Sequence, residues 1–385
     1  IRDGMVVSAA AGATGTLELG ARVAVAADAW GLAASPDGRR LVVTSAWTHT
    51  VTVLDIADGA LRPLGSVDVA REPRAVVVHP LGDTAYVGHL TAMHSLTRID
   101  GIASGRVRAR AVDLPVAPLR TAEKLRATHT GALAFSPDGH RLYVARHAPG
   151  AEVERGWYGV STIDVLLTPE DRPLLALTSP PPAPDGGPPA WRSGSRDGPD
   201  NDLVDRPVPL ALAEALPFVV PRTLVATRVD GAPSLLILSE GRARVTVFDA
   251  LAPAPALATS GAYAVPCPIP MGMVLRSTAP TRVVACRGAS ALTLDDRRVD
   301  LAPDPLPALE ARGRVLFHDA ADPALSGGMS CEGCHPDGRD DGYVWREMET
   351  DSVRARDPSV EPRIFSGRAL EKADGRARQT PMLAG

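Results

Sequence analysis

One turn-and-strand unit recurs along residues 1–300 and restricts the folds that this chain can adopt. The turns are Ser35-Pro36-Asp37-Gly38, His79-Pro80-Leu81-Gly82 and Ser136-Pro137-Asp138-Gly139. Each lies between two strand-like runs, and proline in the second position with glycine in the fourth suits a type I turn between antiparallel strands. The step from Gly38 to Gly82 is 44 residues, which matches one four-stranded propeller blade.

A second strand-like run in each unit closes on an aspartate. The closing runs are 51–55, 95–100, 160–164, 245–249 and 291–295. Residues 6–19 form an opening half-unit, which brings the count to six, and a seventh blade would be split between the two ends or precede Ile1. The strands are apolar on both faces, as expected when every blade is packed between two others. The sequence therefore predicts a mainly β fold with a propeller of six to seven blades over residues 1–302.

A proline- and glycine-rich stretch interrupts the repeat at about 167–221. Such a composition forms neither ladders nor helices, so we expect an inserted loop there. Its carboxylates could ring a Ca²⁺ ion, although their spacing does not match the EF-hand loop and a solvated loop is the simpler interpretation. These residues are Asp197, Asp200, Asp202 and Asp205.

The C-terminal part carries Cys331-Glu332-Gly333-Cys334-His335. C-x-x-C-H is the attachment sequence of a c-type haem, in which two thiols bind the porphyrin and the histidine binds the iron. A zinc site would need two more Cys or His ligands nearby, and no histidine follows His335. A redox dithiol would be expected in a βαβ pattern. The motif therefore predicts a covalent haem c with His335 as the iron ligand.

Two further cysteines and several histidines lie in the repeat region. Cys267 and Cys286 could form a disulfide if the chain curls back across Pro268 and Pro270, with Cys286 opposite about Met273. Most of the histidines are expected to be structural hydrogen-bond donors. His89 and His147 each follow a Tyr-Val strand and are the better candidates to line the axial mouth of the propeller.

The overall charge and hydropathy exclude some partners. The formal net charge is −4, which gives no bias toward nucleic acid. No apolar run is long enough to span a membrane. The chain begins at Ile1 without a charged and apolar leader, so we expect an export signal to have been removed or to lie upstream. Because bacterial haem c is attached outside the cytoplasmic membrane, the sequence predicts a periplasmic or otherwise exported protein.

A proline-rich joint at 303–307 marks a second domain over 303–385. Beyond it, Leu309, Gly313, Leu316 and Phe317 recur at helical spacing, which predicts a packed helix over 308–318. His318 falls in its last turn, where we expect a polar capping residue rather than a ligand. We expect this domain to be a small, all-α, cytochrome c-like fold that is incomplete within the sequence.

Two resemblances bear on these domains. The repeat turns, with Leu142-Tyr143-Val144-Ala145, resemble YVTN-type β-propellers. The ordered C-terminal segments resemble the bacterial di-haem cytochrome c peroxidase family, which includes the haem enzymes that mature tryptophan-derived quinone cofactors. Those segments are Gly313-Arg314-Val315-Leu316-Phe317, the C-x-x-C-H stretch with Ser330, Asp341-Gly342, Trp345, and Arg378-Gln379-Thr380-Pro381-Met382-Leu383. This resemblance implies that Cys331, Cys334 and His335 hold the peroxide-reacting haem, that Trp345 lies between two haems, and that a second haem is held downstream.

The sequence also departs from that family. The distal histidine found in many members is missing after His335, and no second C-x-x-C-H occurs. The sixth iron position would be open, or would be filled by Met348, Met382, Tyr343 or a group outside the domain. Both methionines could equally be core residues. Glu347 and Glu349 could shuttle protons.

The sequence thus predicts a periplasmic haem oxidoreductase with peroxidase-family chemistry, hydrogen peroxide as a reactant and a redox partner protein as electron donor. The propeller would be a scaffold or docking module. The alternatives are a non-catalytic electron carrier on a binding propeller and, with less support from its five tryptophans, a quinohaemoprotein dehydrogenase.

Overall fold

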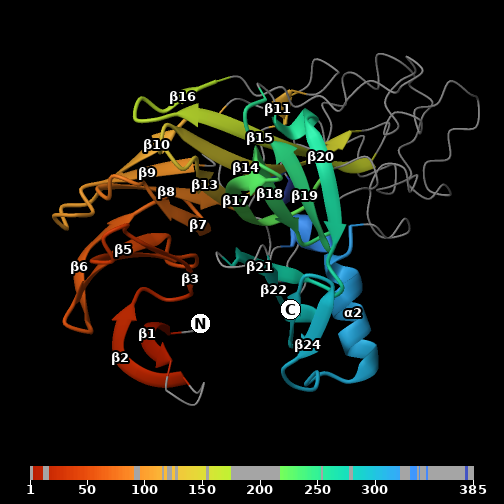
Figure 1. Cartoon of the computed structure of the whole chain (residues 1–385), viewed down its shortest axis with the longest axis horizontal. Coiled ribbons are helices and arrows are strands. Elements are labelled where there is room, and N and C mark those ends of the chain that lie inside the picture. Colours follow the sequence, from red (N-terminus) through yellow and green to blue (C-terminus); the bar gives the residue numbers. More distant parts are fainter. Residues whose placement is uncertain are drawn as a thin grey trace, which may run out of the picture.

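A computed structural model of the chain was analysed over the following residues: 3–11, 17–90, 96–114, 117–118, 124–125, 129–152, 156–174, 217–252, 255–276, 281–320, 330–335, 338, 344–345 and 378–379. Most of them belong to strands, and the chain folds as a β-propeller (Figure 1). The predicted insertion at 167–221 is described only at its two ends, and its four aspartates lie outside the described residues.

Five four-stranded antiparallel sheets follow one another around an arc, and we number them as blades one to five (Figure 1). Blade one is β3 (Ala29–Ala34), β4 (Arg40–Ser45), β5 (Thr50–Ala57) and β6 (Ala60–Asp68). Blade two is β7 (Pro73–Val78), β8 (Thr84–His89), β9 (Leu96–Asp100) and β10 (Arg108–Val112). Blade three is β13 (His129–Phe135), β14 (Arg141–Glu152), β15 (Gly156–Leu167) and β16 (Arg172–Pro173).

Blade four is β17 (Pro221–Val229), β18 (Ala232–Ser239), β19 (Arg244–Asp249) and β20 (Thr259–Ala264). Blade five is β21 (Pro270–Leu275), β22 (Arg282–Cys286), β23 (Ala291–Leu294) and β24 (Arg297–Asp300). Short pairs β11 (Ala117–Pro118) with β12 (Lys124–Leu125), and 3₁₀ turns η2 (Pro255–Leu257) and η3 (Arg287–Ala289), complete the described connections. Within every blade, strands that are consecutive in sequence pair antiparallel.

The recurring turns fold as their composition predicts. In the first, Gly38 N–H donates to the Ser35 carbonyl at 2.9 Å, and Arg40 N–H donates to Ser35 Oγ at 2.9 Å. The Ser35 hydroxyl in turn donates to Asp37 at 2.6 Å, and this hydrogen bond lowers the pKa of the Asp37 carboxyl. Gly38 has φ +70°, a left-handed conformation that glycine adopts without strain. The turn at Ser136 repeats these contacts.

Neighbouring blades share their apolar cores, which explains why the strands are apolar on both faces. Valines 42, 51 and 53 of blade one pack with Ala85, Val87 and Ile99 of blade two. Similar clusters join blade two to three, three to four and four to five. Blades one to four therefore each contribute to two cores, blade five contributes to the core that it shares with blade four, and no blade buries its apolar side chains alone.

The N-terminal hairpin is a partial blade. β1 (Gly4–Ala11) pairs with β2 (Leu17–Val25), and both pack against blade one through Val6, Val23 and Val25. The six to seven expected blades are therefore, within the described residues, five four-stranded sheets and this two-stranded hairpin. The arc is open between the hairpin and blade five over those same residues (Figure 1).

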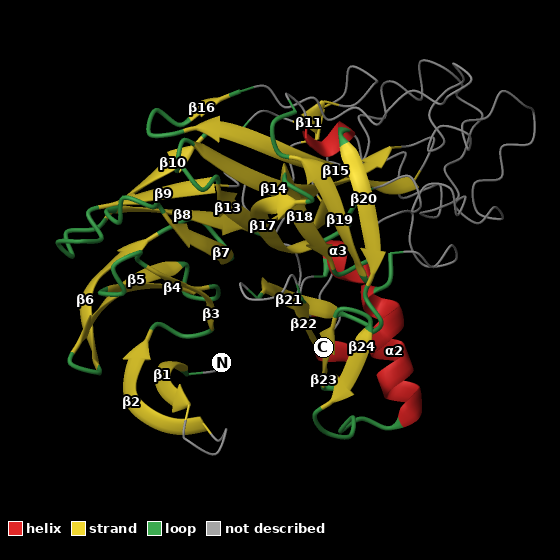
Figure 2. Cartoon of the chain, in the orientation of Figure 1, coloured by secondary structure: helices red, strands yellow, loops and turns green. Residues whose placement is uncertain are grey.

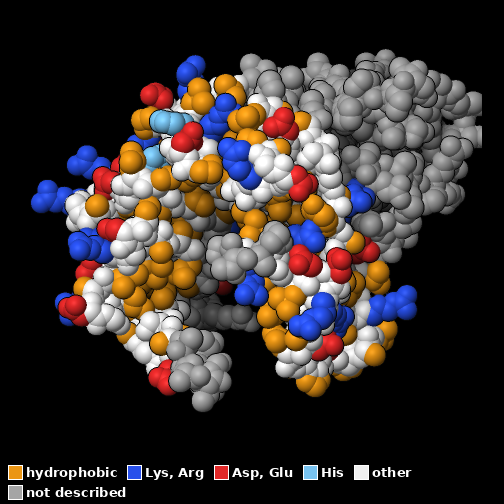
Figure 3. Space-filling view, in the orientation of Figure 1, with side chains coloured by type: hydrophobic (Ala, Val, Ile, Leu, Met, Phe, Trp, Pro, Cys, Tyr) orange, Lys and Arg blue, Asp and Glu red, His pale blue; other side chains and the backbone are white. Residues whose placement is uncertain are grey.

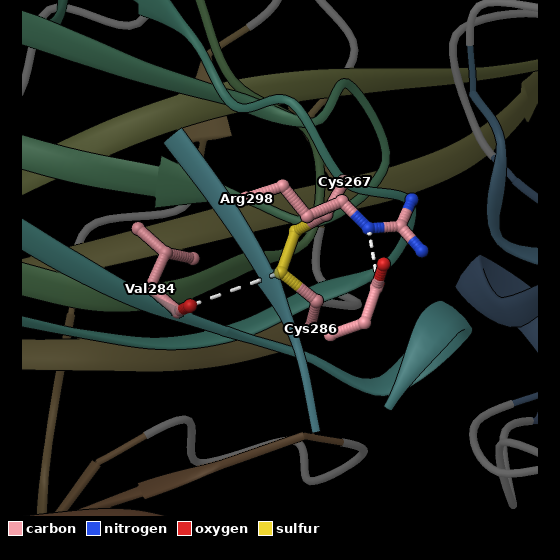
Figure 4. Close-up of a disulfide and its surroundings, with 5 residues drawn as sticks. Cys267, Val284, Cys286 and Arg298 are labelled. Atoms are coloured by element: carbon pink, nitrogen blue, oxygen red, sulfur yellow. Dashed lines mark hydrogen bonds and ion pairs between the residues drawn. A yellow bond between two sulfur atoms is a disulfide. The ribbon is translucent and has the colours of Figure 1, made fainter. Parts of the chain in front are cut away.

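The predicted disulfide is present in blade five, between Cys267 and Cys286 (Figure 4). Their Cα atoms are 6.0 Å apart, an ordinary distance for a bridged pair. The expected register was wrong, because Cys286 is opposite Pro270, and Met273 is opposite Val284. A register shift between Pro270 and Gly272 brings Cys286 next to the chain that leaves Cys267.

After blade five, helix α2 (Ala308–His318) follows β24 and lies beside it, and the short helix α3 (Cys331–Cys334) lies near the end of α2 (Figure 2). The helix bounds confirm the prediction, but the expected packing face was partly wrong: Leu309 is 82% exposed and Gly313 is also exposed. Residues 344–345 (β25, Val344–Trp345) and 378–379 (β26, Arg378–Gln379) pair as strands, which the expected all-α domain did not include. None of the described helices is long and apolar enough to cross a membrane.

Candidate haem-attachment site

The C-x-x-C-H stretch folds as a single helical turn. Helix α3 covers Cys331–Cys334, and His335 caps it, with the His335 backbone N–H donating to the Cys331 carbonyl at 2.9 Å. The two cysteines therefore begin and end one turn, and His335 follows directly. The backbone of the turn is continued by Gly338, whose N–H donates to the His335 carbonyl at 2.9 Å.

The donor groups of this turn fit a covalent haem. Cys331 is a free, half-buried thiol rather than part of a disulfide, and burial raises the pKa of that thiol. His335 Nδ1 is buried and has no hydrogen-bond partner among the described residues. Buried imidazole nitrogens normally have partners, and the described residues supply none to this one. The backbone of Cys334 is in α3, but its side chain lies outside the described residues.

Four buried charged side chains lie where this turn meets blade four, and we name them the ion-pair box: Arg222, Glu240, His318 and Glu332. Arg222 is the second residue of β17, Glu240 follows β18, His318 ends α2, and Glu332 is in α3 itself. Arg222 donates to both carboxylates, through Nε to Glu240 and through Nη2 to Glu332. His318 Nδ1 contacts the other oxygen of Glu240 at 2.5 Å and the other oxygen of Glu332.

The box sets the charge states of its members. Burial acts to lower the pKa of His318, but the carboxylates of Glu240 and Glu332 outweigh it and raise that pKa to about 9. For Glu240, burial acts to raise the pKa of the carboxyl, but Arg222, Glu332 and His318 together outweigh it and hold that pKa below its usual range. Burial and the negative charge of Glu240 raise the pKa of Glu332. One carboxylate oxygen of Glu240, one of Glu332 and one ring nitrogen of His318 lie within 4.8 Å of one another. Arg222 supplies the positive charge that the two carboxylates need.

The first strands of the five blades line a cavity on the propeller axis, with a volume of about 320 Å³. Its wall includes Trp30, Arg74, Gly131, Arg222 and Met271. The Arg74 guanidinium lies 3.8 Å above the centre of the Trp30 ring and pairs with Glu72. The hollow between blade one and blade five is visible in Figure 3. Arg222 therefore belongs to both the cavity wall and the ion-pair box.

The sequence favoured a structural role for the histidines and kept the axial mouth as an alternative for His89 and His147; neither of the two lines this cavity. Both are completely buried within their blades. His89 is a structural residue, with Nδ1 2.8 Å from the Arg71 carbonyl and Nε2 2.8 Å from the Thr97 hydroxyl. His147 has no partner for either ring nitrogen within the described part of the chain. It lies opposite His129, at a ring-centroid distance of 6.2 Å.

Burial keeps this histidine pair neutral. Burial and the neighbouring His147 ring lower the pKa of His129 to about 3. Burial lowers the pKa of His147 to about 4. The charges of Glu332 and Arg222 also act on His129, so the pair is electrostatically linked to the ion-pair box.

Several predicted site residues lie outside the described residues: Met348, Met382, Tyr343, Glu347 and Glu349. Trp345 is described only in its backbone, where it pairs with Arg378. The roles predicted for these residues therefore stay predictions.

Sequence reasoning missed three members of the ion-pair box, Arg222, Glu240 and Glu332, and treated His318 only as a helix-end residue. Glu332 is an unconstrained position of the C-x-x-C-H motif, so the motif itself gave no signal. The one available signal was the pattern of an arginine directly after a strand-opening proline and an acidic residue at the end of the next apolar strand.

Comparisons with known proteins bear on the fold. No protein-family model matches this sequence, and no curated protein matches it. Among solved structures, the periplasmic gluconolactonase of Pseudomonas aeruginosa is similar, with a TM-score of 0.50 and 16% identity over 76% of this chain and 78% of that one. This chain is a β-propeller.

Two weaker similarities were also found. Hydrazine synthase of Kuenenia stuttgartiensis aligns with a TM-score of 0.40 and 17% identity, over 76% of this chain and 88% of that one. The β-propeller domain of Cps50 (Swd1) from Myceliophteria thermophila aligns with a TM-score of 0.43 and 12% identity, over 72% and 73% of the two chains. At these identities the likeness extends to the fold alone.

Proposed function

We propose that this chain is an exported haem c protein that transfers electrons at a haem attached to Cys331 and Cys334, with His335 as the iron ligand. The observation that supports this is the C-x-x-C-H stretch folded as one helical turn, with a free Cys331 thiol and a buried His335 Nδ1 that has no partner among the described residues. The haem would supply one-electron chemistry at its iron. The protein would supply two thioether positions, one axial imidazole and a fixed mounting on the propeller.

The Cys267–Cys286 disulfide supports an exported location, because such bonds persist in oxidising compartments such as the periplasm. We further propose that residues 303–385 belong to a cytochrome domain of the di-haem peroxidase type and that the propeller is of the YVTN type. In that case a redox partner protein would deliver electrons, and hydrogen peroxide would be the reactant at the His335 haem.

The test is maturation of the full chain by export together with the haem-ligation machinery, followed by pyridine haemochrome spectroscopy. A covalent haem c spectrum in the wild type, lost in C331S/C334S, supports the proposal, and a colourless wild-type protein contradicts it. Peroxide added to the reduced protein then separates the two chemistries. Rapid oxidation supports peroxidase chemistry, whereas a spectrum unchanged by peroxide leaves an electron carrier.

A further inference from the structure

We propose that the ion-pair box positions the haem-attachment turn on blade four, so that the haem is mounted on the propeller rather than carried by an independently moving domain. This inference rests on the proposed function. It assigns positioning roles to Arg222, Glu240 and His318, which neither the motif nor the fold identifies, and to Glu332 within the motif.

The four side chains of the box form a closed ring of contacts. Each carboxylate bridges the same two cations: one oxygen faces the Arg222 guanidinium and the other faces His318 Nδ1. The side chains are between 0% and 6% exposed. A buried ion left without its partner is strongly destabilising. Glu332 therefore cannot leave blade four without stranding charges on Arg222 and His318.

A backbone contact ties down the same junction independently of the charges. Ala320, two residues after α2, donates its N–H to the Gly241 carbonyl at 2.8 Å and is fully buried with Val219 and Val220. A Cβ atom on Gly241 would lie 3.0 Å from Ala320 Cβ, so glycine permits this approach. The chain is thus fixed to blade four on both sides of residues 321–329.

The box also connects the turn to the axial cavity. Arg222 contacts Glu332 in the turn and lines the cavity wall. A shift of the Arg222 side chain would therefore alter both the cavity and the mounting of the turn.

The reduction potential of the haem separates positioning from simple electrostatics. If the box acts only through its charges, E240Q removes a negative charge and raises the potential, because the pKa of Glu240 is lowered and its carboxyl is ionised, whereas R222M removes a positive charge and lowers the potential. If the box holds the turn in place, both variants expose the haem to water, which stabilises the ferric state, and both lower the potential.

The variant R222K, which conserves the positive charge, sharpens this test and is less prone to misfolding than R222M. Lysine keeps the positive charge but loses the bidentate fork that joins two carboxylates. Positioning predicts that R222K lowers the potential and accelerates proteolytic release of a haem-bearing C-terminal fragment. A purely electrostatic role predicts a wild-type potential and a wild-type cleavage rate.

The matched control is D171N, which removes a buried carboxylate paired with Arg98 and Arg110 where the outer strands of blades two and three meet. It should destabilise the protein while leaving the potential unchanged. Shifts of opposite sign in E240Q and R222M, or an unchanged potential in R222K, would overturn the positioning role. If no haem is bound in the wild type, the proposed function fails instead, and the proteolysis of R222K still reports on the anchoring of the turn.

Discussion

Polar groups find their partners over very different sequence distances in the blade turns and at the junction between blade four and the attachment turn. In the first turn, the Ser35 hydroxyl contacts Asp37 and Arg40, two and five residues away. At the junction, the partners of Glu332 are Arg222, 110 residues away, and His318, 14 residues away. The turns form from local chemistry alone, whereas the junction forms only once blade four and α2 are both in place.

The largest expected effect is at the junction. R222M leaves the buried carboxylate of Glu240 without its main cation, and we expect the free energy of unfolding to fall by about 3–5 kcal/mol. Denaturant unfolding measures this loss. The control R298M removes an arginine from the exposed pair with Asp300 and should cost less than about 1 kcal/mol. Equal losses in the two variants would remove the distinction between the junction and the surface of a blade.

Acid should destabilise the protein through a second buried polar region, the histidine pair of blade three. The folded-state pKa values of His129 and His147, about 3 and about 4, lie below the ordinary value of 6.5. Above pH 6.5 both histidines are neutral in the folded and in the unfolded chain, so their burial costs no protonation energy. As the pH falls from 6.5 toward 4, the unfolded chain binds protons that the folded pair does not, and the free energy of unfolding falls. The loss should be on the order of a few kcal/mol.

Denaturant unfolding at a series of pH values measures this acid loss. H147L removes one of the two titrating groups and should flatten the curve. H89L is the matched comparison, because the two histidines hold equivalent positions in their blades. His89 pairs with the first residue of β7, and His147 pairs with the first residue of β13. H89L should cost about 1–3 kcal/mol at neutral pH, because the Thr97 hydroxyl and Arg71 carbonyl lose a partner. An acid slope that H147L leaves unchanged would contradict the assignment.

A smaller effect is expected from the backbone approach at the junction. In G241A the new methyl group would lie 3.0 Å from Ala320 Cβ and 3.0 Å from Val219 Cγ1, and the overpacking should cost about 1–3 kcal/mol. G272A adds the same methyl group in blade five, where nothing lies within 4 Å, and should stay within about 0.5 kcal/mol of the wild type. Thermal unfolding of the two variants provides the comparison, and equal melting temperatures would argue against a tight contact at Gly241.

The smallest effect belongs to a single blade turn. G38A places a Cβ atom at φ +70° with free space around it, so only backbone strain is added, about 1–2 kcal/mol. G38N should cost less, because asparagine tolerates the left-handed conformation. Thermal unfolding again measures both variants, and a loss in G38A as large as that in R222M would show that the turns are not independent local units.

These differences explain how much of the molecule could be predicted from its sequence. The turn at Ser35-Pro36-Asp37-Gly38, the strands beside it and the helix over 308–318 depend on neighbours within a few residues, and they were found with nearly correct bounds. The register at Cys286 was missed for two reasons. The connection between β21 and β22 is two residues longer than the expected four-residue turn, and a one-residue shift in β21 leaves no trace in composition. The role of Glu332 was missed because its partners come from blade four and α2. A structural role for His89 was expected, but its two partners, a backbone carbonyl and a hydroxyl, could not be read from the sequence.

The central claim is a haem held covalently by Cys331 and Cys334 on a turn that is fixed to the propeller. Intact mass spectrometry of the exported, matured chain, followed by mapping of the proteolytic fragment that contains residues 331–335, tests it most directly. The account predicts a mass increased by one haem, with the added group on that fragment. An unmodified mass for a chain matured alongside a positive-control cytochrome would contradict it.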